Sequence, residues 1–258
     1  MNVMTMRALC FLLGLGLLAS FALAEEPMRA QAGDALVSGS SFQPYTNLWR
    51  MSAVTSSGKQ VADLGTWSDD LDYVTVNGRR CLQRTQLATF LKDGTVIGRT
   101  RTVNVFDPET LAPISRSFTR HSATGDETTR LLFSQRSIHM EVTSQGKTVK
   151  NDLRLDTPVF DFYGGMYGLL LAGFPLKPGF SATFPSVDED KLTMSWVTFR
   201  VTGQEMADAG PKGNVETWVV ESNTNQGPMK FWLAKEKPYI IRLEFKAGNG
   251  TLWTYRMI

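Results

Sequence analysis

The residue types that carry out catalysis or bind metals are scarce and poorly spaced in this chain. The two histidines, His121 and His139, lie on different predicted strands and do not form the closely spaced pair of a helical zinc site. The sequence has no Gly-x-Ser-x-Gly motif for a nucleophilic serine and no glycine-rich phosphate loop ending in lysine. We therefore expect no bound cofactor and no metal site, and we assign no catalytic residue.

Two acidic runs, 69–72 and 188–190, contain carboxylates that could bind calcium. Neither run has the loop with a central glycine that a calcium-binding hand requires, so we interpret both as solvated loops between strands. Paired carboxylates also hydrolyse glycosidic bonds, and such pairs meet in space rather than in sequence. A hydrolase of envelope polysaccharide or lipid therefore stays open as the alternative function.

The N-terminal segment 1–24 has the layout of a secretory signal peptide. Arg7 precedes an apolar run at 8–18, and the small residues Ala22 and Ala24 form a cleavage site before Glu25. The apolar run is short for a membrane span. We expect cleavage after Ala24, a periplasmic or otherwise extracytoplasmic location, and no transmembrane segment in the mature protein.

Charge and cysteine content limit the partners and the sources of stability. The chain has 27 Lys and Arg against 25 Asp and Glu, without the basic surplus of a nucleic-acid-binding protein. Of the two cysteines, Cys10 lies in the signal segment, which leaves Cys81 without a disulfide partner. We interpret Cys81 as a small buried residue, since free cysteines are among the most buried residue types.

The remaining chain predicts a mainly β protein. Residues 25–43 have few large apolar side chains and predict a flexible tail, and residues 44–258 predict a single β-rich domain. Apolar and polar residues alternate through most of this domain, and turn sequences such as Asn77-Gly78 separate the alternating segments. Because no βαβ rhythm appears, we expect an antiparallel, partly open β-barrel or strongly curved sheet of about a dozen strands.

One segment departs from the strand pattern. Thr157 and Pro158 are typical of a helix start, and Gly173 and Pro175 of a helix end, so a helix is predicted over 158–173. It is apolar nearly all round, which is typical of a buried helix. We therefore expect the sheet to wrap around this helix, with its glycines permitting close approach to the sheet or to a bound molecule.

Aromatic residues on the C-terminal strands can line an apolar surface that faces the helix. The alternative is an ordinary filled core. The predicted ligand-binding set combines helix residues with strand tryptophans: Gly164, Tyr167, Gly168, Trp196, Trp218 and Trp232.

The segments 160–185 (FDFYGGMYGLLLAGFPLKPGFSATFP), 218–221 (WVVE), 231–236 (FWLAKE) and 238–244 (PYIIRLE) resemble an exported bacterial family, the domain of unknown function number 3108. The resemblance covers mainly the C-terminal hundred residues. It implies an extracytoplasmic β-rich domain. The family brings no assigned activity, so no catalytic residue is carried over.

These observations favour a non-enzymatic exported protein that binds a lipid-like, hydrophobic or amphiphilic small molecule, or an envelope protein partner. By analogy of fold alone, it is similar to periplasmic lipoprotein carriers and calycin-type barrels. An outer-membrane barrel is a weaker alternative, because charges are scattered through the predicted strands.

Overall fold

The computed structural model describes residues 26–55, 57–161, 166–188, 193–224, 227–247 and 250–258. The described chain folds into one 15-stranded sheet with a single short α-helix. In chain order the elements are β1 (Met28–Arg29), β2 (Tyr45–Val54), β3 (Gln60–Val76), β4 (Arg79–Lys92), β5 (Thr95–Phe106), β6 (Pro113–Ser122), β7 (Gly125–Phe133), β8 (Ser137–Ser144), β9 (Lys147–Arg154), α1 (Met166–Ala172), β10 (Ser181–Asp188), β11 (Thr193–Asp208), the 3-10 turn η1 (Gly210–Lys212), β12 (Asn214–Thr224), β13 (Gly227–Ala234), β14 (Ile240–Lys246) and β15 (Leu252–Met257).

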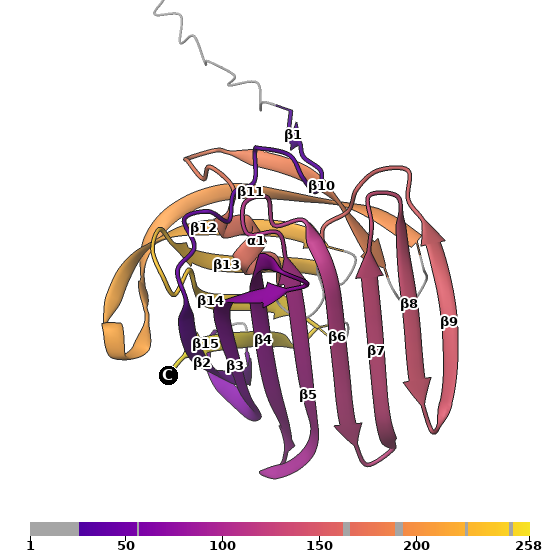
Figure 1. Ribbon diagram of the computed structural model, residues 1–258. Helices are drawn as coiled ribbons and strands as arrows, with labels where there is room; N and C mark the ends of the chain where they lie inside the picture. Colours follow the sequence, from indigo (N-terminus) through magenta and orange to yellow (C-terminus); the bar gives the residue numbers. More distant parts are fainter. Residues whose placement is uncertain (1–25, 56, 162–165, 189–192, 225–226, 248–249) are drawn as a thin grey trace, which may run out of the picture.

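Neighbouring strands of the sheet are antiparallel except for β1, which pairs in parallel with β10. The order runs from β1 through β10 to β15, and then from β2 to β9, so β2 pairs with β15. Figure 1 shows β4 to β9 side by side along one flank, with α1 enclosed between this flank and the arched strands β10 to β14. The expected mainly β fold with a strongly curved, open sheet is confirmed, but the strands number fifteen rather than about a dozen.

The two ends of the sheet approach each other through side chains. Leu131 and Met140 belong to a small apolar cluster, and Val187 and Met194 from the β10–β11 hairpin pack against it. No hydrogen-bond ladder joins β9 to β10 in the described residues. The structure is therefore barrel-like in its packing while the sheet itself stays open.

The segment 25–43 differs from the flexible tail that its composition predicted. In its described part, Met28 and Arg29 pair with β10, and Ala30, Val37 and Phe42 are buried. A few well-placed apolar residues suffice here, because the edge of β10 offers unpaired backbone groups that a short strand can satisfy.

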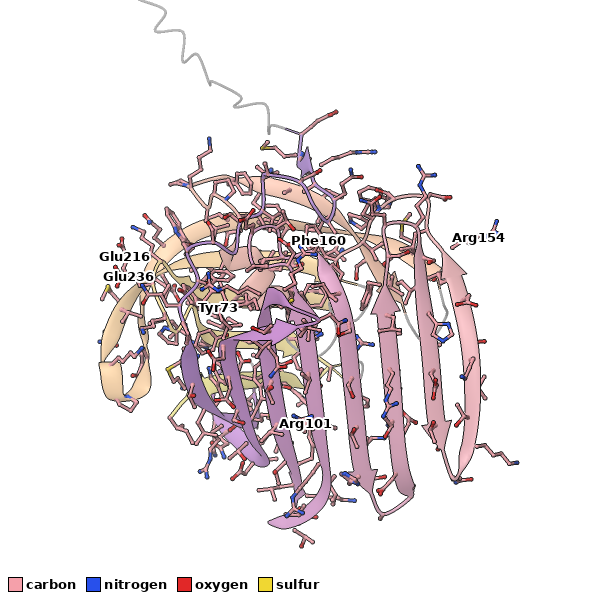
Figure 2. All side chains as sticks on the ribbon, in the orientation of Figure 1. Tyr73, Arg101, Arg154, Phe160, Glu216 and Glu236 are labelled. Atoms are coloured by element: carbon pink, nitrogen blue, oxygen red, sulfur yellow. The ribbon has the colours of Figure 1, made fainter. Side chains whose placement is uncertain are left out.

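The predicted helix 158–173 is also shorter than expected. The described helix spans Met166–Ala172, residues 162–165 lie outside the described part of the chain, and residues 158–161 are not helical. The amide of Phe160 instead donates to the carbonyl of Pro185 at 3.1 Å, and the Thr157 hydroxyl donates to the side chain of Gln31. Figure 2 shows Phe160 in the interior and Arg154 at the outer edge of β9. Edge pairing with β10 thus replaces the helical start that Thr157 and Pro158 predicted.

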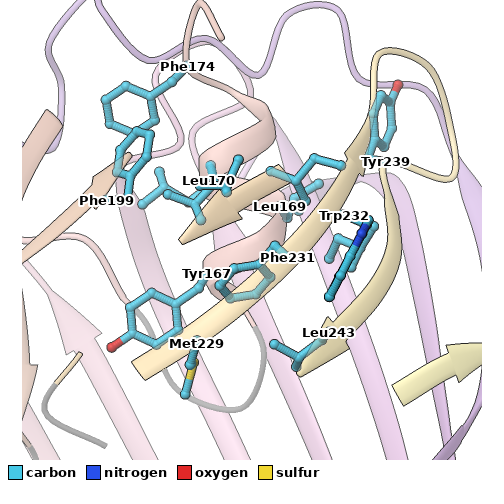
Figure 3. Close-up of a cluster of buried hydrophobic side chains, with 14 of the residues drawn as sticks. Tyr167, Leu169, Leu170, Phe174, Phe199, Met229, Phe231, Trp232, Tyr239 and Leu243 are labelled. Atoms are coloured by element: carbon cyan, nitrogen blue, oxygen red, sulfur yellow. The ribbon is translucent and has the colours of Figure 1, made fainter. Parts of the chain in front are cut away.

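Helix α1 is the centre of the main core. Leu169, Leu170 and Leu171 are buried, and α1 packs on β13 and β14. Figure 3 shows the helix side chains beside Phe231 and Leu243 of those strands. The expectation of a sheet curved around one buried helix is therefore correct for the described turns of this helix.

Candidate ligand-binding cleft

A cleft of about 520 Å³ opens on the face of the sheet that carries the main core. Strand alternation places every second residue of each strand on this face, for example Gln86, Ala88 and Phe90 on β4. The cleft draws its lining from β2 to β6 and from β13 to β15. The lining residues are Met51, Trp67, Gln86, Ala88, Phe90, Thr100, Thr102, Phe118, Arg120, Met229, Leu243, Phe245, Trp253 and Tyr255.

Aromatic rings form much of this surface and hold one another in place. The ring of Trp67 meets that of Tyr255 edge-on at 5.5 Å and stacks on Trp49 at 4.8 Å. The rings of Phe245 and Trp253 lie 5.2 Å apart. Burial raises the pKa of Tyr255, so its phenol stays neutral at physiological pH. The result is a fixed, largely apolar wall.

Gln86 is the most unusual residue of the lining. Its side chain is 3% exposed, and neither its Nε2 nor its Oε1 has a hydrogen-bond partner among the described residues. In register it stands opposite Asp69 on β3 and Thr102 on β5. Buried amides in proteins nearly always have partners, so this one calls for an explanation.

On the same face, Asp69 forms a buried ion pair with Arg84, the next inward-facing residue of β4. Arg84 donates to the two carboxylate oxygens of Asp69 at 2.5 and 2.6 Å, and the Tyr45 hydroxyl donates to Asp69 at 2.9 Å. Burial opposes the charge of Arg84, but Asp69 and Tyr45 together outweigh it and raise the arginine pKa. Burial, together with the same carboxylate, raises the pKa of Tyr45 well above its ordinary value. Asp69 is thus engaged in structural contacts.

This position corrects the interpretation of run 69–72 as a solvated loop. Asp69 lies inside β3 and is fully buried, because strand alternation puts it on the same face as Trp67 and Leu71. Asp72 is exposed at the same strand. Run 188–190 is described only at Asp188, which ends β10.

Residues 52–252 match the family model described as "Protein of unknown function (DUF3108)". The chain belongs to this family. The C-terminal resemblance seen in the sequence therefore extends over most of the protein. No curated protein matches the chain in sequence.

A solved structure supports the same architecture for this DUF3108 protein. It is the crystal structure of a β-barrel-like protein of the domain of unknown function DUF1849 from Brucella abortus, with a TM-score of 0.57 and 9% identity. The match covers 83% of this chain and 95% of that chain. At this level of identity the similarity concerns the fold alone.

The residues predicted to bind a ligand are dispersed in the DUF3108 fold, and none of the described ones lines the cleft. Tyr167 is buried in α1, and Gly168 packs against Ile240. Trp196 is exposed beneath Arg29, whose guanidinium lies 5.4 Å from the ring. Gly164 lies outside the described residues.

The other two tryptophans have local partners. The Trp232 indole donates to Glu205, and Arg242 lies 4.2 Å from its ring centre. Trp218 is half-buried beside Lys235. A ligand at these residues stays a prediction. The cleft itself was missed because Trp67 falls between the predicted strands, and because both faces of the segment 80–91 carry apolar residues, so that alternation there does not show which face is the inner one.

A smaller hollow of about 340 Å³ lies where β4 begins and β5 ends, and it is more polar. Arg79 pairs there with Asp107. Burial favours protonation of Asp107, but hydrogen bonds from the Thr110 amide and hydroxyl and from the Glu109 amide outweigh it and hold the pKa of Asp107 below its ordinary value. These contacts fix the loop that follows β5.

In the described part of the chain, no group of three or more His, Cys, Asp or Glu residues is placed to hold a metal ion. His121 and His139 each lie beside one aspartate near the surface, at 2.9 and 2.8 Å. Over the same residues, no helix has the length and apolar character needed to cross a membrane.

Proposed function

We propose that this protein is exported and binds a hydrophobic or amphiphilic small molecule in the 520 Å³ cleft, without catalysing a reaction on it. The observation that carries the proposal is the lining itself. Aromatic and aliphatic side chains dominate it, and a few polar groups, Gln86 among them, interrupt it. Small-molecule sites in proteins are typically of about 300–1,000 Å³ and have this composition.

The driving force for such binding is the removal of apolar surface from water. Each square ångström of apolar surface buried is worth roughly 25 cal/mol. Because the rings of Trp67, Tyr255 and Phe245 already pack on one another, a ligand would not have to order them. The apolar wall is therefore already arranged to bind a ligand.

The alternative, an envelope hydrolase, finds less support at this site. A glycosidase needs two carboxyl groups that face each other across the substrate. The described residues that line the cleft include neither aspartate nor glutamate, and the nearby Asp69 is held by Arg84 and Tyr45. We therefore place the proposed function in the binding class.

Filling the cleft tests the proposal directly. Ala88 lines the cleft on β4, whereas its neighbour Leu87 points to the other face and is exposed. Ala88→Trp should abolish the binding of a fluorescent apolar dye such as phenylnaphthylamine, and Leu87→Trp should leave it unchanged. Ala88→Leu provides a milder variant in which folding is easier to retain. Equal dye binding by wild type and a folded Ala88→Trp variant would refute the cleft as the site.

The nature of the ligand requires a second experiment. The exported protein is purified without detergent, extracted with organic solvent, and the extract is analysed by mass spectrometry against an extract of the Ala88→Trp variant. A lipid-like compound present only in the wild-type extract is expected. N-terminal sequencing of the same material tests the proposed export, for which cleavage after Ala24 is expected and an intact Met1 would be contrary.

A further inference from the structure

Resting on the proposed function, we infer that the ligand is an amphiphile whose polar group is uncharged and both donates and accepts hydrogen bonds. An amide or a hydroxyl has this chemistry. Gln86 would hold that group inside the cleft, while the apolar part of the ligand packs on the aromatic wall. The inference starts from a buried side chain of the described lining, Gln86, whose hydrogen-bonding capacity the fold leaves unused.

The fold does not account for Gln86. Its nearest charged neighbour in register, Asp69, is held by Arg84 and Tyr45. Both polar atoms of the Gln86 amide therefore stay without a partner among the described residues, at 3% exposure. A leucine or methionine would fill the same strand position without the cost of burying an amide. The amide thus points to recognition of a molecule from outside the chain.

The charges around Gln86 favour a neutral group. A buried charge must be paired to be tolerated, and Asp69 and Arg84 already compensate each other. Among the described residues of the lining there is one arginine, Arg120, whose side chain is half-exposed and pairs with Glu127 at 3.0 Å. A carboxylate or phosphate beside Gln86 would have Asp69 nearby and, in the described part of the lining, no unpaired cation. The glutamine amide, by contrast, offers one acceptor and two donors to a neutral partner.

The experiment compares three probes with the same alkyl chain: decanamide, decanol and decanoate at neutral pH. Each displaces phenylnaphthylamine from wild type, from Gln86→Met and from Gln83→Met. Methionine has nearly the shape of glutamine without its hydrogen-bonding groups. Gln83 lies on the same strand but on the opposite face, so it provides the matched control.

For wild type we expect decanamide and decanol to bind more tightly than decanoate. Gln86→Met should weaken decanamide about tenfold, the value of roughly two neutral hydrogen bonds, and leave decanoate nearly unchanged. Gln83→Met should match wild type for all three probes. If Gln86→Met alters the packing, Gln86→Leu repeats the test.

Two outcomes separate this inference from the proposed function. If the probes bind but Gln86→Met weakens all three equally or none of them, or if wild type prefers decanoate, the role of Gln86 is refuted and the cleft survives as a binding site. If no probe displaces the dye and the dye itself does not bind, the proposed function fails, and the inference fails with it.

Discussion

Gly168→Ala should destabilise the protein even though alanine is the better helix former. Gly168 lies in α1, where the helix packs on β14. A Cβ at this position would lie 2.7 Å from Cδ1 and 2.8 Å from Cγ1 of Ile240, and 3.3 Å from its Cγ2. Ordinary carbon–carbon contacts are about 3.5–4.0 Å, so the helix or the isoleucine must move.

Two opposing effects set the magnitude. Alanine gains roughly 1 kcal/mol over glycine in helix propensity. A methyl group forced into a packed core typically costs about 1–3 kcal/mol. Ile240 is buried, and two of its atoms are involved, which favours the upper part of that range. We therefore expect a net loss of about 1–2 kcal/mol in the free energy of unfolding.

Urea denaturation of a double-mutant cycle measures this contact. Ile240→Val removes the nearest atom, so Gly168→Ala should cost less in the valine background than in wild type. Gly203→Ala is the control, because its added Cβ would meet no heavy atom within 4 Å. Stabilisation by Gly168→Ala in wild type, or identical costs in both backgrounds, would show that α1 does not depend on close approach to β14.

Three further predictions concern buried and partly buried groups. Arg84→Met should lower the free energy of unfolding, measured by urea denaturation, by about 3–5 kcal/mol because it leaves Asp69 buried and uncompensated. Adding Asp69→Leu in the same chain should restore most of that stability. Equal stability of the single and double variants would contradict this prediction. Asp107→Asn should lower the melting temperature at neutral pH. Because the folded-state pKa of Asp107 is depressed, the difference should begin to shrink as pH falls below the unfolded value of about 3.9 and should vanish only below the lower folded-state pKa, and a difference that persists at still lower pH would exclude the charge as its cause. Leu171→Asp should unfold the protein, since a buried carboxylate costs several kcal/mol out of a typical free energy of unfolding of about 5–15 kcal/mol. Leu132→Asp, at an exposed position, should have the melting temperature of wild type. Equal melting temperatures of the two variants would place α1 at the surface.

Local sequence patterns predicted the hairpins well. Asn77 and Gly78 have φ angles of 51° and 78°, and Asp93 and Gly94 have 52° and 76°. Two consecutive positive φ angles are what a two-residue hairpin turn requires, and Asn-Gly and Asp-Gly adopt them readily. The β3–β4 and β4–β5 pairings follow from these turns.

Patterns that depend on distant partners were harder to interpret. Thr157 and Pro158 are compatible with a helix start, but the free edge of β10 binds the following residues instead. Asp69 has the local context of an acidic loop, and its burial depends on Arg84. The cleft is the extreme case, because its walls come from both ends of the chain and meet only where β15 pairs with β2.

Strand β4 itself contains the strongest argument for a ligand. Arg84 and Gln86 are next neighbours on its inner face, both polar and both buried. The first has bonds to both carboxylate oxygens of Asp69, and the second has no partner among the described residues. Fold stability accounts for Arg84, because removing either Arg84 or Asp69 would leave the other as a buried, unpaired charge. Fold stability does not account for Gln86. Replacing Gln86 by methionine should raise the melting temperature of the unliganded protein. The ligand proposed above would account for Gln86, a buried polar residue that lines the cleft.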